Sequence, residues 1–126
     1  MHLIKAMIIA GLGGFAGTCL RFLSGRMCAA LFGNAFPWGT LAVNLAGSFL
    51  IGILFGLAEK TSLLPASMSV FLITGFCGGL TTFSTLADDM YLMLEQHRFL
   101  SFGAYAAATF LLGLMLVWLG RMLVRA

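Results

Sequence analysis

The chain has 126 residues, of which 61% are hydrophobic and only 9% are charged, and its formal net charge is +3. Because soluble domains have roughly 25% charged residues, this composition excludes a soluble protein and indicates an all-α integral membrane protein. A spanning helix needs about 20 apolar residues, so the length suits four spans and leaves no room for a separate catalytic domain. The seven lysines and arginines are scattered rather than clustered, which argues against nucleic-acid binding.

Four apolar segments follow one another along the chain and form a single transmembrane domain over residues 1–126. We expect the spans at residues 4–31, 38–58, 66–96 and 99–124. Pro37 suits the first turn of the second span, where its missing N–H is not needed. Pro65 opens the third span in the same way.

The third span contains paired glycines followed by a cluster of hydroxyl side chains. We expect its helix to be broken at residues 78–82, beginning at Gly78 and Gly79. In lipid a helix breaks only where the freed backbone groups find other partners, and such breaks are typical of ion or substrate sites. The polar groups at this break are backbone carbonyls and hydroxyls, which suit a hard cation such as Na⁺.

Small residues recur at four-residue spacing in three of the spans. The pairs are Gly13 and Gly17, Gly52 and Gly56, and Gly75 and Gly79. Glycines at this spacing let helix backbones approach closely. Because four thin helices enclose little interior, we expect that a partner subunit completes the structure.

The cations give only a weak orientation signal. Four alternating spans place Lys5, Lys60, Arg121 and Arg125 on one side of the membrane, and Arg26 and Arg98 on the other. Cytoplasmic loops normally carry a clear excess of lysine and arginine. The weak bias allows insertion in both orientations, from which an antiparallel homodimer would follow.

Polar side chains line up on two of the spans. Thr40, Asn44 and Ser48 share one face of the second span, and Tyr105 and Thr109 share one face of the fourth. An amide in hydrocarbon is expensive without partners. Two interpretations of Asn44 stay open: it forms hydrogen bonds between helices, or it lines an ion pathway.

Other candidates lie close to the break or inside a span. Arg21 sits within an apolar stretch with no acid nearby in sequence, which favours either a functional role or snorkelling to the interface. Phe83 directly follows the break, and its ring has a positive edge that can meet an anion. Asp88 and Asp89 are expected to face water near a membrane surface.

Three motifs identify a family. They are Gly-x-x-x-Arg at residues 17–21, PWGTLxVNxxG at 37–47 and TGFCGGLTTFST at 74–85. With these motifs the chain resembles, over essentially its whole length, the CrcB proteins, also called Fluc fluoride channels. The resemblance implies antiparallel dual-topology homodimers of four-helix subunits in the bacterial cytoplasmic (inner) membrane, with two fluoride pathways and a central structural sodium ion that is not transported. It also implies passive export of fluoride and fluoride resistance.

The resemblance also assigns site residues. Backbone carbonyls of Gly78 and Thr81 would hold the sodium ion. Asn44, Phe83 and Tyr105 match a pore amide, a pore phenylalanine and a pore tyrosine. The residues expected along the fluoride pathway are Asn44, Phe83, Tyr105, Thr109, Thr40, Ser84 and Arg21. The chain departs from the pattern at Leu86, where many members have a second pore phenylalanine, and at Gly113, where some have a polar residue.

Two alternatives compete with a channel, and an enzyme is not among them, because the chain has no Ser-His-acid set. A small proton-coupled multidrug exporter needs a carboxylate deep in the membrane. The first, second and fourth spans contain no acid within their apolar stretches, which counts against it. A non-transporting assembly protein would leave the break in the third span unexplained.

Overall fold

The computed structural model describes residues 1–126, and all its regular elements are helical. The first two spans are single helices, α1 (Leu3–Phe32) and α2 (Trp38–Lys60). The third consists of α3 (Ala66–Ser69), η1 (Val70–Cys77), α4 (Gly78–Leu80) and α5 (Phe83–Glu95). The fourth consists of α6 (Phe99–Ala107), η2 (Ala108–Leu112) and α7 (Gly113–Arg125), where η1 and η2 are π-helical stretches.

Four helical segments are long and apolar enough to cross a membrane. They cover Leu3–Phe32, Trp38–Lys60, Ala66–Glu95 and Phe99–Arg125. The prediction of an all-helical protein with four segments long and apolar enough to span a membrane is therefore confirmed.

The helix ends follow local sequence signals. The His2 side chain accepts a hydrogen bond from the Ile4 N–H at 3.3 Å and caps the start of α1. Gly33, with φ of 77°, ends that helix, and its N–H donates to the Ala29 carbonyl at 2.9 Å. Pro37 and Pro65 stand immediately before α2 and α3, where the missing proline N–H costs nothing.

The α5–α6 connection is a tight helix ending. The N–H of His97 donates to the Leu94 carbonyl and the N–H of Arg98 donates to the Met93 carbonyl, at 3.1 and 2.8 Å. This is a Schellman arrangement, in which the residue at the position of His97 adopts a left-handed conformation. His97 has φ of 57°, and glycine is the more usual residue there.

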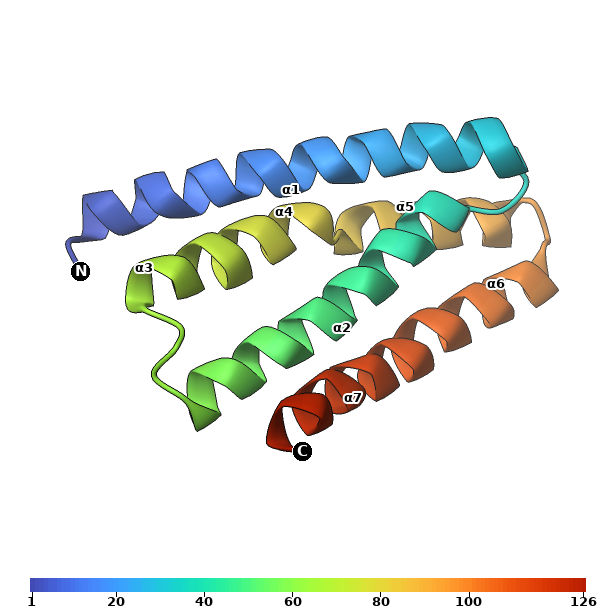
Figure 1. Cartoon of the computed structure of the whole chain (residues 1–126). Coiled ribbons are helices and arrows are strands. Elements are labelled where there is room, and N and C mark those ends of the chain that lie inside the picture. Colours follow the sequence, from blue (N-terminus) through green and yellow to red (C-terminus); the bar gives the residue numbers. More distant parts are fainter.

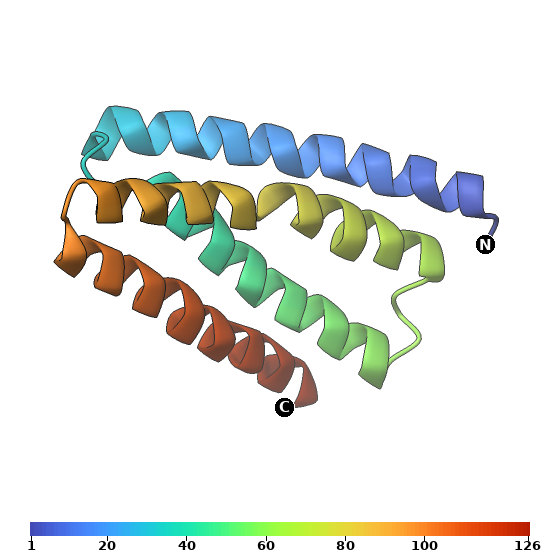
Figure 2. The same ribbon diagram turned by 180° about the vertical axis from the view of Figure 1, so that it is seen from behind.

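The spans pack as two pairs (Figures 1 and 2). α1 runs beside the third span, and α2 runs beside α7. The N-terminus and the 61–65 connection lie at one end of the bundle, and the 33–37 and 96–98 connections lie at the other. Lys60 Nζ donates to the Val124 carbonyl at 2.6 Å, which joins the end of α2 to the end of α7.

Glycines let α1 and the third span meet backbone to backbone. A Cβ added to Gly17 would overlap the Phe76 carbonyl oxygen, and one added to Gly79 would overlap the Gly14 carbonyl oxygen. Gly13 and Gly75 are equally close to the opposite backbone. These glycine pairs therefore make close contacts between helices of the same chain.

The second contact of this kind joins α2 to α7. A Cβ on Gly52 would overlap the Val117 carbonyl oxygen, and one on Gly120 would overlap the Phe49 carbonyl oxygen. Contacts within one chain therefore account for these glycines, and the partner subunit stays a prediction.

The enclosed core is small and lies towards one end. Only 17 of 126 residues are buried, so most apolar side chains face outward, as a bilayer protein allows. The main cluster contains Leu41, Leu86, Met93 and Tyr105, and Phe36 from the 33–37 connection packs against it. This cluster fixes α5 against α2 and α6 and so positions the residues that follow the interruption of the third span.

Candidate functional site

The third span is interrupted at two threonines. Thr81 has φ −90° and ψ 156°, and Thr82 has φ −150° and ψ 121°, so both are extended between α4 and α5. Gly78 and Gly79 are helical, so the expectation that the break begins at these glycines is wrong. Gly79 is needed for close contact with α1, whereas the interruption lies where α2 supplies new hydrogen-bond partners.

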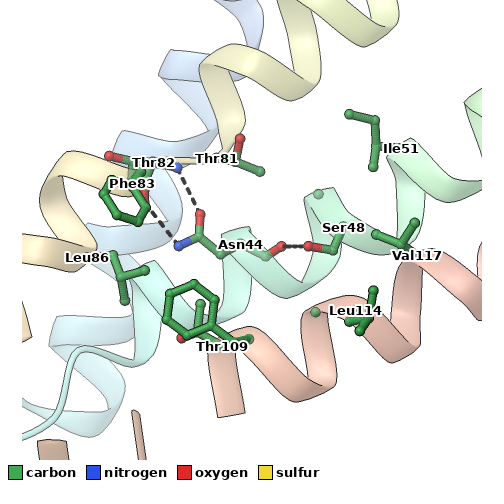
Figure 3. Close-up of a pocket in the computed structure, with 13 residues that line it drawn as sticks. Asn44, Ser48, Ile51, Thr81, Thr82, Phe83, Leu86, Thr109, Leu114 and Val117 are labelled. Atoms are coloured by element: carbon green, nitrogen blue, oxygen red, sulfur yellow. Dashed lines mark hydrogen bonds between the residues drawn. The ribbon is translucent and has the colours of Figure 1, made fainter. Parts of the chain in front are cut away.

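Asn44 of α2 supplies those partners (Figure 3). Its Nδ2 donates to the Thr82 carbonyl at 3.1 Å, and its Oδ1 accepts from the Thr82 N–H at 2.8 Å. The residue is only 8% exposed, so both bonds satisfy groups that hydrocarbon would leave unpaired. An amide has two N–H donors, and one of them remains available after this pairing.

The interruption redirects two helical hydrogen bonds. In a continuous α-helix the Thr82 N–H would donate to the Gly78 carbonyl, but it donates to Asn44. The Thr85 N–H would donate to the Thr81 carbonyl, but it donates to Thr82 Oγ1 at 3.3 Å, which caps α5. The carbonyls of Gly78 and Thr81 therefore both lose their α-helical donors.

Arg21 of α1 binds the neighbouring carbonyl. Its Nε donates to Gly79 O at 2.9 Å. Gly79 lies at the C-terminal end of α4, where the carbonyls carry partial negative charge and favour a cation. The arginine thus has a backbone partner in place of the acid that is missing from its sequence neighbourhood.

A cavity of about 390 Å³ lies beside the interruption, between α2, α5 and the fourth span (Figure 3). Asn44, Phe83 and Thr109 all line it. Phe83 is 71% exposed, although it is a large apolar residue. Three of the residues expected along an ion pathway are therefore brought together from three different spans.

The hydroxyls around this cavity are not equivalent. Ser48 Oγ donates to the Asn44 carbonyl at 2.7 Å, and Thr81 Oγ1 donates to the Cys77 carbonyl at 2.8 Å, so both bond to a carbonyl four residues earlier in the chain. Thr109 Oγ1 is buried and has no hydrogen-bond partner in the chain. A buried hydroxyl without any partner is costly, and Thr109 is the only residue of this cavity whose hydroxyl is in that position.

The other predicted residues lie elsewhere. Arg21 and Thr40 line a neighbouring cavity of about 230 Å³, which shares Thr82 with the first. Ser84 is exposed in the first turn of α5. Tyr105 is fully buried and does not line the larger cavity.

Tyr105 instead forms a polar contact that sequence reasoning missed. Its hydroxyl donates to Asp89 Oδ2 at 2.9 Å, and Thr40 lies next to both groups. Asp88 is exposed, as expected, whereas Asp89 is half-buried and lines a cavity of about 220 Å³ near the 33–37 connection. No sequence signal pairs these residues, since they belong to different spans.

The chain matches known proteins over most of its length. The family model described as CrcB-like protein, Camphor Resistance (CrcB), matches residues 8–121. A protein of Vibrio cholerae is 41% identical over 109 residues, 86% of each chain, and one of Pseudoalteromonas translucida is 41% identical over 113 residues, 90% of this chain and 94% of its own. One of Rhizobium etli is 39% identical over 124 residues, 98% of each chain. All three are named fluoride-specific ion channel FluC. The chain belongs to the CrcB family.

Proposed function

We propose that this chain is a fluoride channel through which fluoride leaves the cytoplasm passively, conferring fluoride resistance. The observation that carries the proposal is the interrupted third span. It is held by Asn44 beside a cavity that Asn44, Thr109 and Phe83 line together. The names of the relatives identify fluoride as the ion.

The cavity has the chemistry that a strongly hydrated anion needs. A pore must replace the water around the ion with other donors. The remaining N–H of Asn44 and the hydroxyl of Thr109 can donate, and the ring edge of Phe83 is positive. No lysine or arginine lines this cavity, which suits conduction because binding must stay weak enough for release.

The remaining pathway residues lie at different places around the interruption. Arg21 and Thr40 line the adjoining smaller cavity, which suits the approach of an anion to the interruption. Ser84 stands beside Phe83 at the start of α5. Tyr105 affects the pathway only indirectly, because its hydroxyl already donates a hydrogen bond to Asp89.

The backbone oxygens at the interruption suit a structural sodium ion. The carbonyls of Gly78 and Thr81 have lost their helical donors, and backbone carbonyls at unwound membrane helices are typical ligands of Na⁺. In an antiparallel homodimer each chain would contribute two such carbonyls. The ion would hold the two interruptions together and would not be transported.

The driving force is the membrane potential. An inside-negative potential expels a monovalent anion with about 2.3 kcal/mol per 100 mV. No coupling ion or nucleotide is required for this direction of transport. The proposed location is the bacterial inner membrane, with two antiparallel chains and two fluoride pathways in each dimer.

Ion efflux from liposomes that contain only the purified protein tests the proposal. With potassium and valinomycin to balance charge, we expect rapid fluoride efflux and far slower chloride efflux. Folded protein that releases no fluoride would refute the channel. The alternative of a proton-coupled exporter uses Asp89 as its half-buried acid, and it predicts uptake of a cationic dye only under a proton gradient.

A further inference from the structure

Three side chains separate the larger cavity from a second one further along α5. The second cavity has a volume of about 280 Å³ and is lined only by hydrophobic residues, among which Tyr91 alone carries a hydroxyl. Phe83, Leu86 and Phe110 line both cavities, and no other residue does. We call these three residues the aromatic wall.

The aromatic wall offers an anion no hydroxyl and no amide. Asn44 and Thr109 belong to the larger cavity alone. An ion that passes from the larger cavity along α5 must therefore be solvated at the wall by ring edges, which are positive. Leu86 has no such edge and is only 2% exposed, because it packs into the core cluster.

Phe110 is the remaining aromatic residue of the wall. It is 54% exposed, and it directly follows Thr109, whose hydroxyl has no partner. Both residues belong to the π-helical stretch η2 (Ala108–Leu112), and π-helical insertions occur frequently at functional sites. The insertion places Thr109 and Phe110 on the lining of the same cavity from consecutive positions.

We propose that Phe110 is a further pathway residue, which with Phe83 supplies the ring edges that solvate fluoride between the two cavities. The inference rests on the proposed fluoride channel. It adds a residue of the fourth span to the pathway at the point where Leu86 cannot contribute.

Fluoride efflux from liposomes separates the ring edge of Phe110 from its bulk. Phe110→Met keeps most of the side-chain volume without a ring, and we expect fluoride efflux to fall about tenfold, the effect of a barrier raised by roughly 1.4 kcal/mol. Phe110→Tyr keeps the ring and should conduct at close to the wild-type rate. Phe83→Met should show a loss similar to that of Phe110→Met.

The matched control is Phe15→Met on α1, where Phe15 is 73% exposed and lines none of the cavities described here. It should leave efflux unchanged. Size-exclusion chromatography and thermal melting verify that each variant is folded, and Phe110→Leu replaces Phe110→Met if the latter aggregates. Wild-type efflux from a folded ringless variant overturns the role of Phe110 alone, whereas absence of efflux from wild-type protein overturns the channel itself.

Discussion

Asn44 joins α2 to the interruption of the third span through two hydrogen bonds to one residue, Thr82. An amide suits this position because it offers a donor and an acceptor side by side, as a backbone neighbour would. The interpretations of Asn44 as a link between helices and as a pathway residue are therefore compatible. The side chain uses its oxygen and one N–H for the link and keeps one N–H for an ion.

Asn44→Ala should lower both stability and fluoride efflux. The substitution leaves the Thr82 N–H and carbonyl unpaired at a part-buried site, and each such group costs about 1–3 kcal/mol. Thermal melting of the purified protein and liposome efflux measure the two effects. For the melting temperature, Ser48→Ala is the control on the same helix face, because the Ser48 hydroxyl only bonds back to the Asn44 carbonyl, and such bonds add little to helix stability. An unchanged melting temperature for Asn44→Ala would contradict the link.

Thr109→Val should separate stability from function. The hydroxyl of Thr109 is buried without a partner in the chain, so an isosteric methyl removes a polar burial cost of about 1–3 kcal/mol. We expect an equal or higher melting temperature together with slower fluoride efflux. A clear loss of stability would show that this hydroxyl has a partner in the assembled protein.

At the scale of the elements, close backbone contact decides which glycines can change. Gly17 on α1 has no room for a side chain, because a Cβ would overlap the Phe76 carbonyl oxygen of η1. A Cβ added to Gly11, on the same helix, would meet no other atom within 4 Å. The two residues therefore form a matched pair with identical chemistry and different surroundings.

Gly17→Ala should destabilise the protein, and Gly11→Ala should not. Overpacking at Gly17 forces α1 away from η1, at a typical cost of about 1–3 kcal/mol. At Gly11 the same change improves helix propensity by up to about 1 kcal/mol. Thermal melting in detergent compares them, and equal melting temperatures for both variants would be incompatible with the close contact between α1 and η1.

The four spans were predictable from sequence because long apolar runs and proline positions are local signals. The place of the interruption was not. Glycine is a weak helix former, so the sequence predicts the break at Gly78 and Gly79, but a side chain 38 residues away decides where the helix opens. The contact between Asp89 and Tyr105, and the part of Phe110 in the aromatic wall, also depend on packing between spans that no local pattern encodes.

At the scale of the whole molecule, the lysines and arginines show only a weak bias between the two ends, with four at the end that holds both termini and two, Arg26 and Arg98, at the other. Glu59 pairs with Arg121 at 2.7 Å and lies 3.8 Å from Arg125, so part of the positive charge near the C-terminus is compensated. At the opposite end the Arg98 side chain donates to the Ala35 carbonyl and holds the 33–37 connection. Neither end has the clear excess of lysine and arginine that fixes the orientation of most membrane proteins.

Insertion in both orientations should make the C-terminus accessible from both sides of the membrane. A cysteine introduced by Ala126→Cys, with Cys19 and Cys28 changed to alanine, reports its position; Cys77 can stay because it is 1% exposed. In intact spheroplasts we expect a membrane-impermeant maleimide to label about half of the protein, since the weak charge bias does not fix one orientation. Permeabilised cells supply the full-labelling control. Complete labelling, or none, in intact spheroplasts would show a single orientation and would exclude the antiparallel dimer, because two chains inserted the same way cannot form it.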